Sequence, residues 1–277
     1  MFIDSKTLDS KTPDIKCQNS NIYFLSEYYL IKKFLTNHSN IMKRRLSRYE
    51  KAKQMGQIEG LVTPIDILET ENGFSGYIEP IIPGTLSNQI TQFSEVVNER
   101  RHTITIDEIA EYFLKCKKII DNCNKNGIIN PDMCSSGNVL YNKLTKQVSF
   151  VDYNDMQVGT ICSESYSSFL SSKNPILETK KYFDGEMYTK NLDIYSLTIR
   201  AFYYMTKINL PRAIGSYDIN ELLKLANMQQ TTFGDCVRVL YDPNRNNLDI
   251  TEPLNELCKE YKLAPFIPGQ VRKIAKK

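Results

Sequence analysis

Two short segments of this chain decide its fold. The first reads Asp132-Met133-Cys134-Ser135-Ser136-Gly137-Asn138-Val139-Leu140-Tyr141, and the second reads Val148-Ser149-Phe150-Val151-Asp152-Tyr153-Asn154. An Asp and an Asn precede an apolar pair, a polar turn comes next, and a β-branched and aromatic run ends at a second Asp. Such a pattern predicts a hairpin that brings oxygen ligands together, and oxygen ligands are those that Mg²⁺ prefers.

These residue types match the needs of phosphoryl transfer, which depends on positioning and charge neutralisation more than on covalent chemistry. A carboxylate must face the attacking hydroxyl, oxygen ligands must hold Mg²⁺ against the phosphates, and a cation must bind the phosphate oxygens. We expect Asp132 in the first role and Asn138 with Asp152 in the second. A lysine on an upstream strand is expected in the third.

Upstream of these segments the chain has the pattern of a small sheet. Residues 22–25 and 28–35 are β-rich runs joined by a short polar turn, which predicts a hairpin. Residues 61–68 and 74–79 flank an Asn-Gly turn signal and predict a second hairpin. Residues 41–56 carry apolar side chains at helical spacing, so one helix is expected between the hairpins.

Downstream of the second hairpin the predicted elements are mainly helices. Residues 107–125 have the clearest apolar stripe, and residues 1–20 are expected to be a loose arm or an edge strand. Residues 160–190 have the composition of an irregular loop. The other predicted helices are residues 86–97, 192–205, 218–227, 232–241 and 251–261. The chain is therefore predicted to be α+β, with a β-rich part over 1–81 and a larger helical part over 82–277.

Taken in order, the segments resemble the protein kinase superfamily. The helix leading to Asp132 is similar to the approach to a kinase catalytic loop, residues 138–141 to the Asn-Ile-Leu sequence after it, and residues 150–154 to the metal-binding Asp-Phe-Gly element. Asp193 opens a segment similar to the central helix of the larger lobe, where an Asp braces the catalytic loop. The resemblance implies a bilobal fold, with a five-stranded sheet before residue 80 and a site between the lobes.

The resemblance also implies which residues surround a nucleotide. Lys32, on the same strand face as Leu30, would bind the phosphates and would be held by Glu50 of the first helix, and Lys33 is the alternative lysine. Residues 79–84 would form a hinge against the adenine ring. The implied nucleotide-binding residues are Leu30, Lys32, Ile78, Glu79, Ile81 and Leu140.

The implied function is ATP- and Mg²⁺-dependent transfer of the γ-phosphate to a hydroxyl, with Ser or Thr of a protein favoured as acceptor. A pseudokinase that acts as a binding or regulatory module is the first alternative. It is suggested by the six-residue step from Asp132 to Asn138, where five is usual, and by the lack of a glycine-rich loop near residues 16–21. A kinase of aminoglycosides, choline or similar small molecules is the second, and a helical scaffold unrelated to kinases is the third.

Composition restricts the other classes of function. The net charge of +3 gives no reason to expect nucleic-acid binding, and the basic residues at 43–48 are predicted to be a solvated helix face. The sequence has no apolar run long enough to span a membrane and no signal-peptide pattern at its start. Seven cysteines without a C-x-x-C pair argue against zinc or a disulfide framework. We expect a cytoplasmic protein whose partners are ATP and a protein substrate or regulatory protein.

Overall fold

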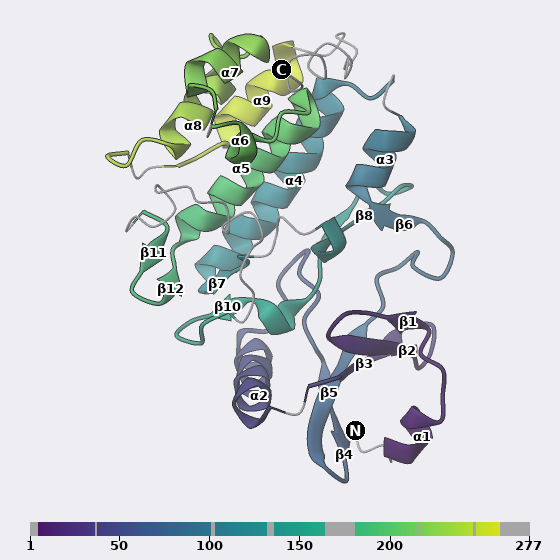
Figure 1. Ribbon diagram of the computed structural model, residues 1–277. Helices are drawn as coiled ribbons and strands as arrows, with labels where there is room; N and C mark the ends of the chain where they lie inside the picture. Colours follow the sequence, from purple (N-terminus) through teal and green to yellow (C-terminus); the bar gives the residue numbers. More distant parts are fainter. Residues whose placement is uncertain are drawn as a thin grey trace.

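The computed structural model describes residues 5–36, 38–100, 103–131, 136–163, 181–214, 216–245 and 248–260. Within these ranges the chain is a mixed α and β protein, in which a five-stranded antiparallel sheet precedes a mainly helical part (Figure 1). We name residues 5–80 the sheet region and residues 90–260 the helical region. Among the described helices, none combines the length and the apolar character needed to cross a membrane.

The sheet has the strand order β1-β2-β3-β5-β4, and each neighbouring pair is antiparallel. Both predicted hairpins are confirmed, as is the five-stranded sheet before residue 80. The segment before the first hairpin contains a short helix, α1 (Ser5–Asp9), besides the expected edge strand. The strands are β1 (Ile15–Lys16), β2 (Ser20–Phe24), β3 (Tyr29–Phe34), β4 (Asp66–Thr70) and β5 (Gly73–Pro80).

The two faces of the sheet carry different groups, because side chains alternate along each strand. On one face, Ile31 of β3 is buried in a cluster with Leu8, Tyr23 and Leu68, so α1 covers this side. The opposite face carries Lys32 and meets α2 (Ser39–Met55), the helix predicted between the hairpins. Three buried aromatic residues form an apolar cluster between this face and α2: Phe34, Tyr49 and Tyr77.

Gly76 allows β5 to lie close to the strand that carries Lys32. A Cβ atom at Gly76 would lie 2.1 Å from the backbone oxygen of Lys32, a distance that no side chain can occupy. The close approach therefore depends on glycine at this position.

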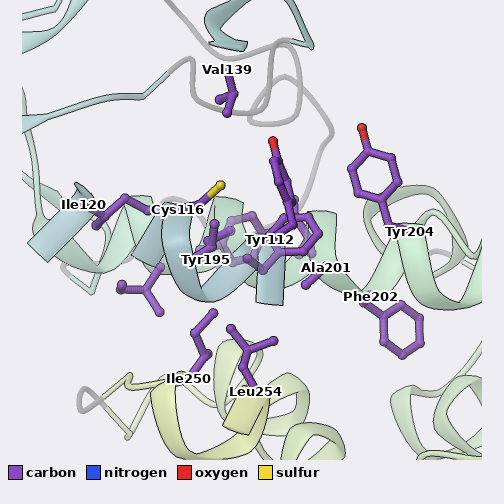
Figure 2. Packing of buried hydrophobic residues seen from close by; sticks show 14 of the residues in the cluster. Tyr112, Cys116, Ile120, Val139, Tyr195, Ala201, Phe202, Tyr204, Ile250 and Leu254 are labelled. Carbon is purple, nitrogen blue, oxygen red and sulfur yellow. The ribbon is translucent and has the colours of Figure 1, made fainter. Parts of the chain in front are cut away.

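The helical region is organised around α4 (Ile106–Lys125), which begins at a capping box formed by Thr105 and Glu108. This helix packs against α5 (Lys190–Thr206) and α9 (Thr251–Glu260). Figure 2 shows Ile250 and Leu254 reaching from the α9 segment toward the layer that holds Tyr112 and Tyr195. The remaining helices are α3 (Phe93–Glu99), α6 (Leu210–Ala213), α7 (Ile219–Leu225) and α8 (Thr232–Leu240).

The hairpin predicted from the two site segments is also present. Strands β8 (Val139–Asn142) and β9 (Val148–Phe150) pair antiparallel, and β6 (Ile90–Gln92) adds a third strand. The single helix predicted over residues 86–97 is therefore wrong in its first half, because residues 90–92 are drawn into this sheet. Two smaller pairs complete the architecture, β7 (Ile128–Ile129) with β10 (Gln157–Val158) and β11 (Phe183–Asp184) with β12 (Met187–Tyr188).

The loop predicted over residues 160–190 is described only at its ends. Residues 164–180 lie outside the described residues, and the β11–β12 hairpin lies within residues 183–188.

Candidate functional site

A cavity of about 770 Å³ opens where the sheet faces the β8–β9 hairpin. Apolar side chains line part of it, which is the usual character of a small-molecule site. Charged and amide side chains line another part. The sheet contributes Ile22, Leu30, Lys32 and Glu79, the hairpin side contributes Asn138, Leu140, Val151 and Asp152, and the rim includes residues 17–20 and 80–82.

Lys32 is the central cation of this cavity. It is 8% exposed, and its Nζ atom donates hydrogen bonds to a carboxylate oxygen of Asp152 and to Oδ1 of Asn154, the latter at 2.6 Å. Burial alone lowers the pKa of Lys32, but the carboxylates of Asp152 and Glu79 outweigh that effect and raise it. Lys32 is therefore held as a cation inside the cavity.

Lys33, the alternative lysine, lies elsewhere. It pairs with Asp9 near α1, on the side of the sheet away from the cavity. The alternation of β3 separates the two lysines, and the structure brings Lys32 to the cavity.

Asn138 and Asp152 lie at the two ends of the β8–β9 hairpin. The N–H of Val151 donates to the backbone oxygen of Asn138 at 3.0 Å, which fixes the two loops beside each other. Asp152 has a left-handed backbone, with φ 71° and ψ 41°, a conformation that Asp tolerates better than most residues. Both side chains line the cavity, as the sequence predicted for a pair of metal ligands.

The donor set of this pair fits Mg²⁺. Proteins bind Mg²⁺ through one or two carboxylates and leave the other positions to water and phosphate oxygens. In the described ranges no three His, Cys, Asp or Glu side chains cluster closely enough to form an all-protein metal site. Asn138 and Asp152 would therefore hold the ion together with a bound phosphate.

Two further carboxyl groups shape the electrostatics of the cavity. Burial raises the pKa of Glu79, and Lys32 offsets part of this effect. Burial also raises the pKa of Asp155, as does the nearby Asp152 carboxylate, while Arg45 counteracts both from 3.5 Å. The cavity thus concentrates charges of both signs away from water, which strengthens their interactions.

Helix α2 contributes arginines to this area. Arg45 is 4% exposed and lies over the Phe34 ring, and Arg48 is fully buried. The Nε atom of Arg48 donates to the backbone oxygen of Met156 at 2.9 Å, and its Nη2 atom donates to that of Cys162. The prediction of a solvated basic helix face is therefore wrong at Arg45 and Arg48, which anchor α2 to the segment after Asp152.

The predicted ion pair between Lys32 and Glu50 is not formed. Glu50 is exposed on α2, whereas the buried face of this helix carries Arg45, Arg48, Tyr49 and Ala52. Position 50 lies about 200° around the helix from position 48, so its side chain points away from the sheet. Lys32 takes its carboxylate partner from Asp152 instead.

The prediction that Ile78 belongs to the nucleotide site is also wrong. It pairs with Ile31 in the sheet and shares the face that α1 covers, so it does not line the cavity. Leu30, Glu79, Ile81 and Leu140 all line it. The predicted hinge residue Ile81 uses its N–H internally, because this group donates to the backbone oxygen of Tyr28 at 2.8 Å.

Asp132, the predicted hydroxyl-facing carboxylate, lies outside the described residues. The chain just before it is held firmly. Oδ1 of Asp193 accepts the backbone N–H of Asn130 at 3.0 Å, and burial raises the pKa of Asp193 to about 8. Asp193 does not cap α5, whose N-cap is Thr189, and its Oδ2 atom accepts a hydrogen bond from the amide of Asn124 at 3.0 Å.

Sequence reasoning missed Arg48, Asn154 and the rim at residues 17–20. A signal for the first existed, because Arg45, Arg48, Tyr49 and Ala52 follow the spacing of a single helix face. Asn154 follows Asp152 by two residues and was available as a second partner for the lysine.

No protein-family model and no curated protein matches the chain.

Proposed function

We propose that this chain is an ATP- and Mg²⁺-dependent phosphotransferase with a bilobal, protein kinase-like fold. Residues 1–81 would form the smaller lobe and residues 82–277 the larger one, and a Ser or Thr hydroxyl of a protein is the favoured acceptor. The observation that carries the proposal is the convergence of Lys32, Asn138 and Asp152 on one cavity that also has apolar walls.

The polarity of the cavity supports a defined orientation of the nucleotide. Ile22 and Leu30 from the sheet and Leu140 from the hairpin supply apolar surface for a flat base. Lys32 supplies a cation for the phosphate oxygens at the end where Asp152 lies. A phosphate bound there would compete with Asp152 and Asn154 for the three N–H groups of Lys32.

Asn138 and Asp152 would hold Mg²⁺, which neutralises the charge on the phosphate oxygens when bound. The protein's own contribution is to position the groups. The bond from Val151 to Asn138 holds the two loops together, and the anchoring of Asn130 by Asp193 fixes the start of the segment that carries Asp132. Asp132 is assigned the role of facing the acceptor hydroxyl.

Thermal unfolding with and without Mg²⁺ and ATP tests nucleotide binding. At 100 times its Kd, a ligand stabilises a folded protein by about 2.7 kcal/mol, which raises the Tm measurably. Lys32→Met is expected to abolish most of this rise, and Lys33→Met, on the other face of the sheet, is the matched control. A folded wild-type protein with no nucleotide-dependent shift would defeat the proposal.

Incubation with γ-labelled ATP tests phosphoryl transfer, with Asp152→Ala beside the wild type. The proposal expects labelled protein from the wild type and at least a hundredfold less from the variant, because a ligand for the metal is lost. Equal labelling by both proteins would remove Asp152 from the metal site.

A pseudokinase is the second candidate function. One observation favours it, since the ion pair between Lys32 and Asp152 joins the group proposed for phosphate to the group proposed for metal. A pseudokinase would transfer no label, whether or not nucleotide changes its Tm. The labelling experiment therefore separates it from the enzyme.

A further inference from the structure

Glu79 is a buried carboxyl group that the proposed phosphoryl transfer does not use. The residue is 6% exposed, and its Oε1 atom is shielded from solvent and has no hydrogen-bond partner within the described part of the chain. A buried acceptor left without a partner is destabilising, so native proteins rarely keep one without a reason.

The position of Glu79 points its side chain into the cavity. In the sheet it is directly opposite Leu30, and both residues line the cavity, whereas the neighbouring Ile78 faces the other side. Lys32 lies two residues along β3 from Leu30 on the same face. Glu79 therefore lies where the apolar wall meets the charged end.

Part of the backbone after Glu79 is already committed to bonds within the protein. Pro80 has no N–H, and the N–H of Ile81 donates to Tyr28 at 2.8 Å. The carbonyl oxygen of Ile82 accepts from the N–H of Thr85 at 3.1 Å and from its hydroxyl at 2.7 Å. These three groups cannot recognise a base edge without breaking bonds within the protein.

Lys32 does not satisfy Glu79, because its hydrogen bonds go to Asp152 and Asn154. Burial raises the pKa of Glu79, and the positive charge of Lys32 offsets part of that rise. The Oε1 atom is an acceptor with no donor among the described residues. The wall of the cavity therefore presents an acceptor that a donor from the ligand would satisfy.

We propose that Glu79 selects the nucleobase by accepting a hydrogen bond from an exocyclic amino group. Bases that present an amino group at this edge, adenine or cytosine, satisfy the carboxylate, whereas a base with an oxo group there places two acceptors against each other. The inference rests on the nucleotide-binding function proposed above and adds a specificity determinant to it.

The test compares ATP with ITP, which carries a 6-oxo group and a protonated N1 in place of the 6-amino group and unprotonated N1 of ATP. Dissociation constants are measured by calorimetry in the presence of Mg²⁺. The wild type is expected to bind ATP at least tenfold more tightly than ITP. Glu79→Gln, which can accept or donate at this position, is expected to bring the two constants within threefold. The matched control is Glu69→Gln, an exposed glutamate of the same sheet, which should keep the wild-type ratio.

The outcomes distinguish failure of the role of Glu79 from failure of nucleotide binding. Equal affinity of the wild type for ATP and ITP overturns the role of Glu79 alone and leaves nucleotide binding intact. The same conclusion holds if Glu79→Gln weakens both nucleotides by one factor and keeps their ratio. Absence of binding of either nucleotide to the folded wild type overturns the proposed function and the inference with it. The wild-type comparison needs no variant, so equal affinities for ATP and ITP would overturn the role of Glu79 even if Glu79→Gln fails to fold.

Discussion

The sheet region and the helical region bury different kinds of side chain. The sheet region buries four charged residues, Lys32, Arg45, Arg48 and Glu79, although two of its apolar clusters have only four and three residues. The helical region is built around one continuous apolar core that runs through α4, α5 and α9 and also takes in Ala52, Ile58 and Leu61 of the sheet region. Burying charge costs several kcal/mol per ion before any partner is found, and small clusters do little to offset it.

The buried charged side chains of the two regions also differ in what surrounds them. In the helical region, the Nζ atom of Lys181 donates to the backbone oxygens of Val239 at 2.5 Å and Asp242 at 2.9 Å. Asp193 likewise accepts a backbone N–H, and Lys117 pairs with Asp121 at 2.8 Å, so these three buried charges of the described helical region act within the structure. In the sheet region, Arg48 also bonds to backbone oxygens, but Lys32, Arg45 and Glu79 line the cavity. Buried charge that lines a cavity is typical of binding sites.

The largest expected effect of a single substitution at constant pH compares the two cores directly. Leu254→Ala, in the core of the helical region, should reduce the free energy of unfolding by about 3–5 kcal/mol. Leu68→Ala, in the four-residue cluster of the sheet region, should cost about 2–3 kcal/mol, because a small cluster collapses more easily around the lost side chain. Urea unfolding measures both. A larger loss for Leu68 would contradict the contrast between the cores.

The second effect concerns the charges that hold α2. Arg48→Ala should cost about 2–4 kcal/mol, because the backbone oxygens of Met156 and Cys162 lose their donor. Lys43→Ala, an exposed change on the same helix, should stay within about 0.5 kcal/mol. The measurement is again urea unfolding, and an equal effect of both substitutions would show that the Arg48 contacts contribute nothing.

The third effect is a dependence of stability on pH that arises in the helical region. The pKa of Asp193 is about 8 in the folded chain and near 3.8 when exposed, so between these values the folded state holds a proton that the unfolded state has released. Stability should therefore fall as the pH rises from about 4 to about 8, by up to about 1.4 kcal/mol per pH unit from this group.

Asp193→Asn removes the titration and keeps an oxygen for the N–H of Asn130. Unfolding free energies of the wild type and the variant should therefore diverge steadily between pH 5 and pH 8, with the variant less dependent on pH. Parallel curves would mean that Asp193 stays ionised in the folded protein.

The smallest effect uses two tyrosines with the same chemistry. Tyr77 and Tyr182 are fully buried, and each donates its hydroxyl to a backbone oxygen, that of Arg45 in the sheet region and that of Leu240 in the helical region. Either Phe substitution should cost about 1 kcal/mol. Because Arg45 lines the cavity, Tyr77→Phe should also weaken ATP binding severalfold, while Tyr182→Phe leaves it unchanged. Equal ATP affinities in both variants would uncouple this contact from the cavity.

Much of the fold could be predicted because its signals are local. The Asn-Gly turn located the β4–β5 hairpin, and the capped apolar stripe located α4. Strand alternation was enough to distinguish the faces of Lys32 and Lys33. Within the site, the same locality brought Asn138 and Asp152 together, since one hairpin joins them.

The errors arose where a partner comes from a distant part of the chain. The packing of Tyr49, Ala52 and Met55 predicts Glu50 as the partner of Lys32. The rotation of α2 is instead set by aromatic packing and by carbonyl groups more than a hundred residues away. Residues 90–92 became a strand because β8 offers an edge, which no pattern within 86–97 encodes. Helical spacing places Arg48 on the packed face of α2, but arginine is seldom buried, and its tertiary contacts explain why it is buried here.

The segment after α2 rests on a strand that is synthesised much later. Leu61 forms a parallel bridge with Phe150, and the N–H of Val62 donates to the oxygen of Phe150 at 2.8 Å. That partner leaves the ribosome about ninety residues later, which at about 5–20 residues per second is a delay of several seconds. During this time the end of α2 and the residues after it lack the strand against which they finally lie. The segment between α2 and β4 therefore reaches its final contacts only after β9 has been synthesised.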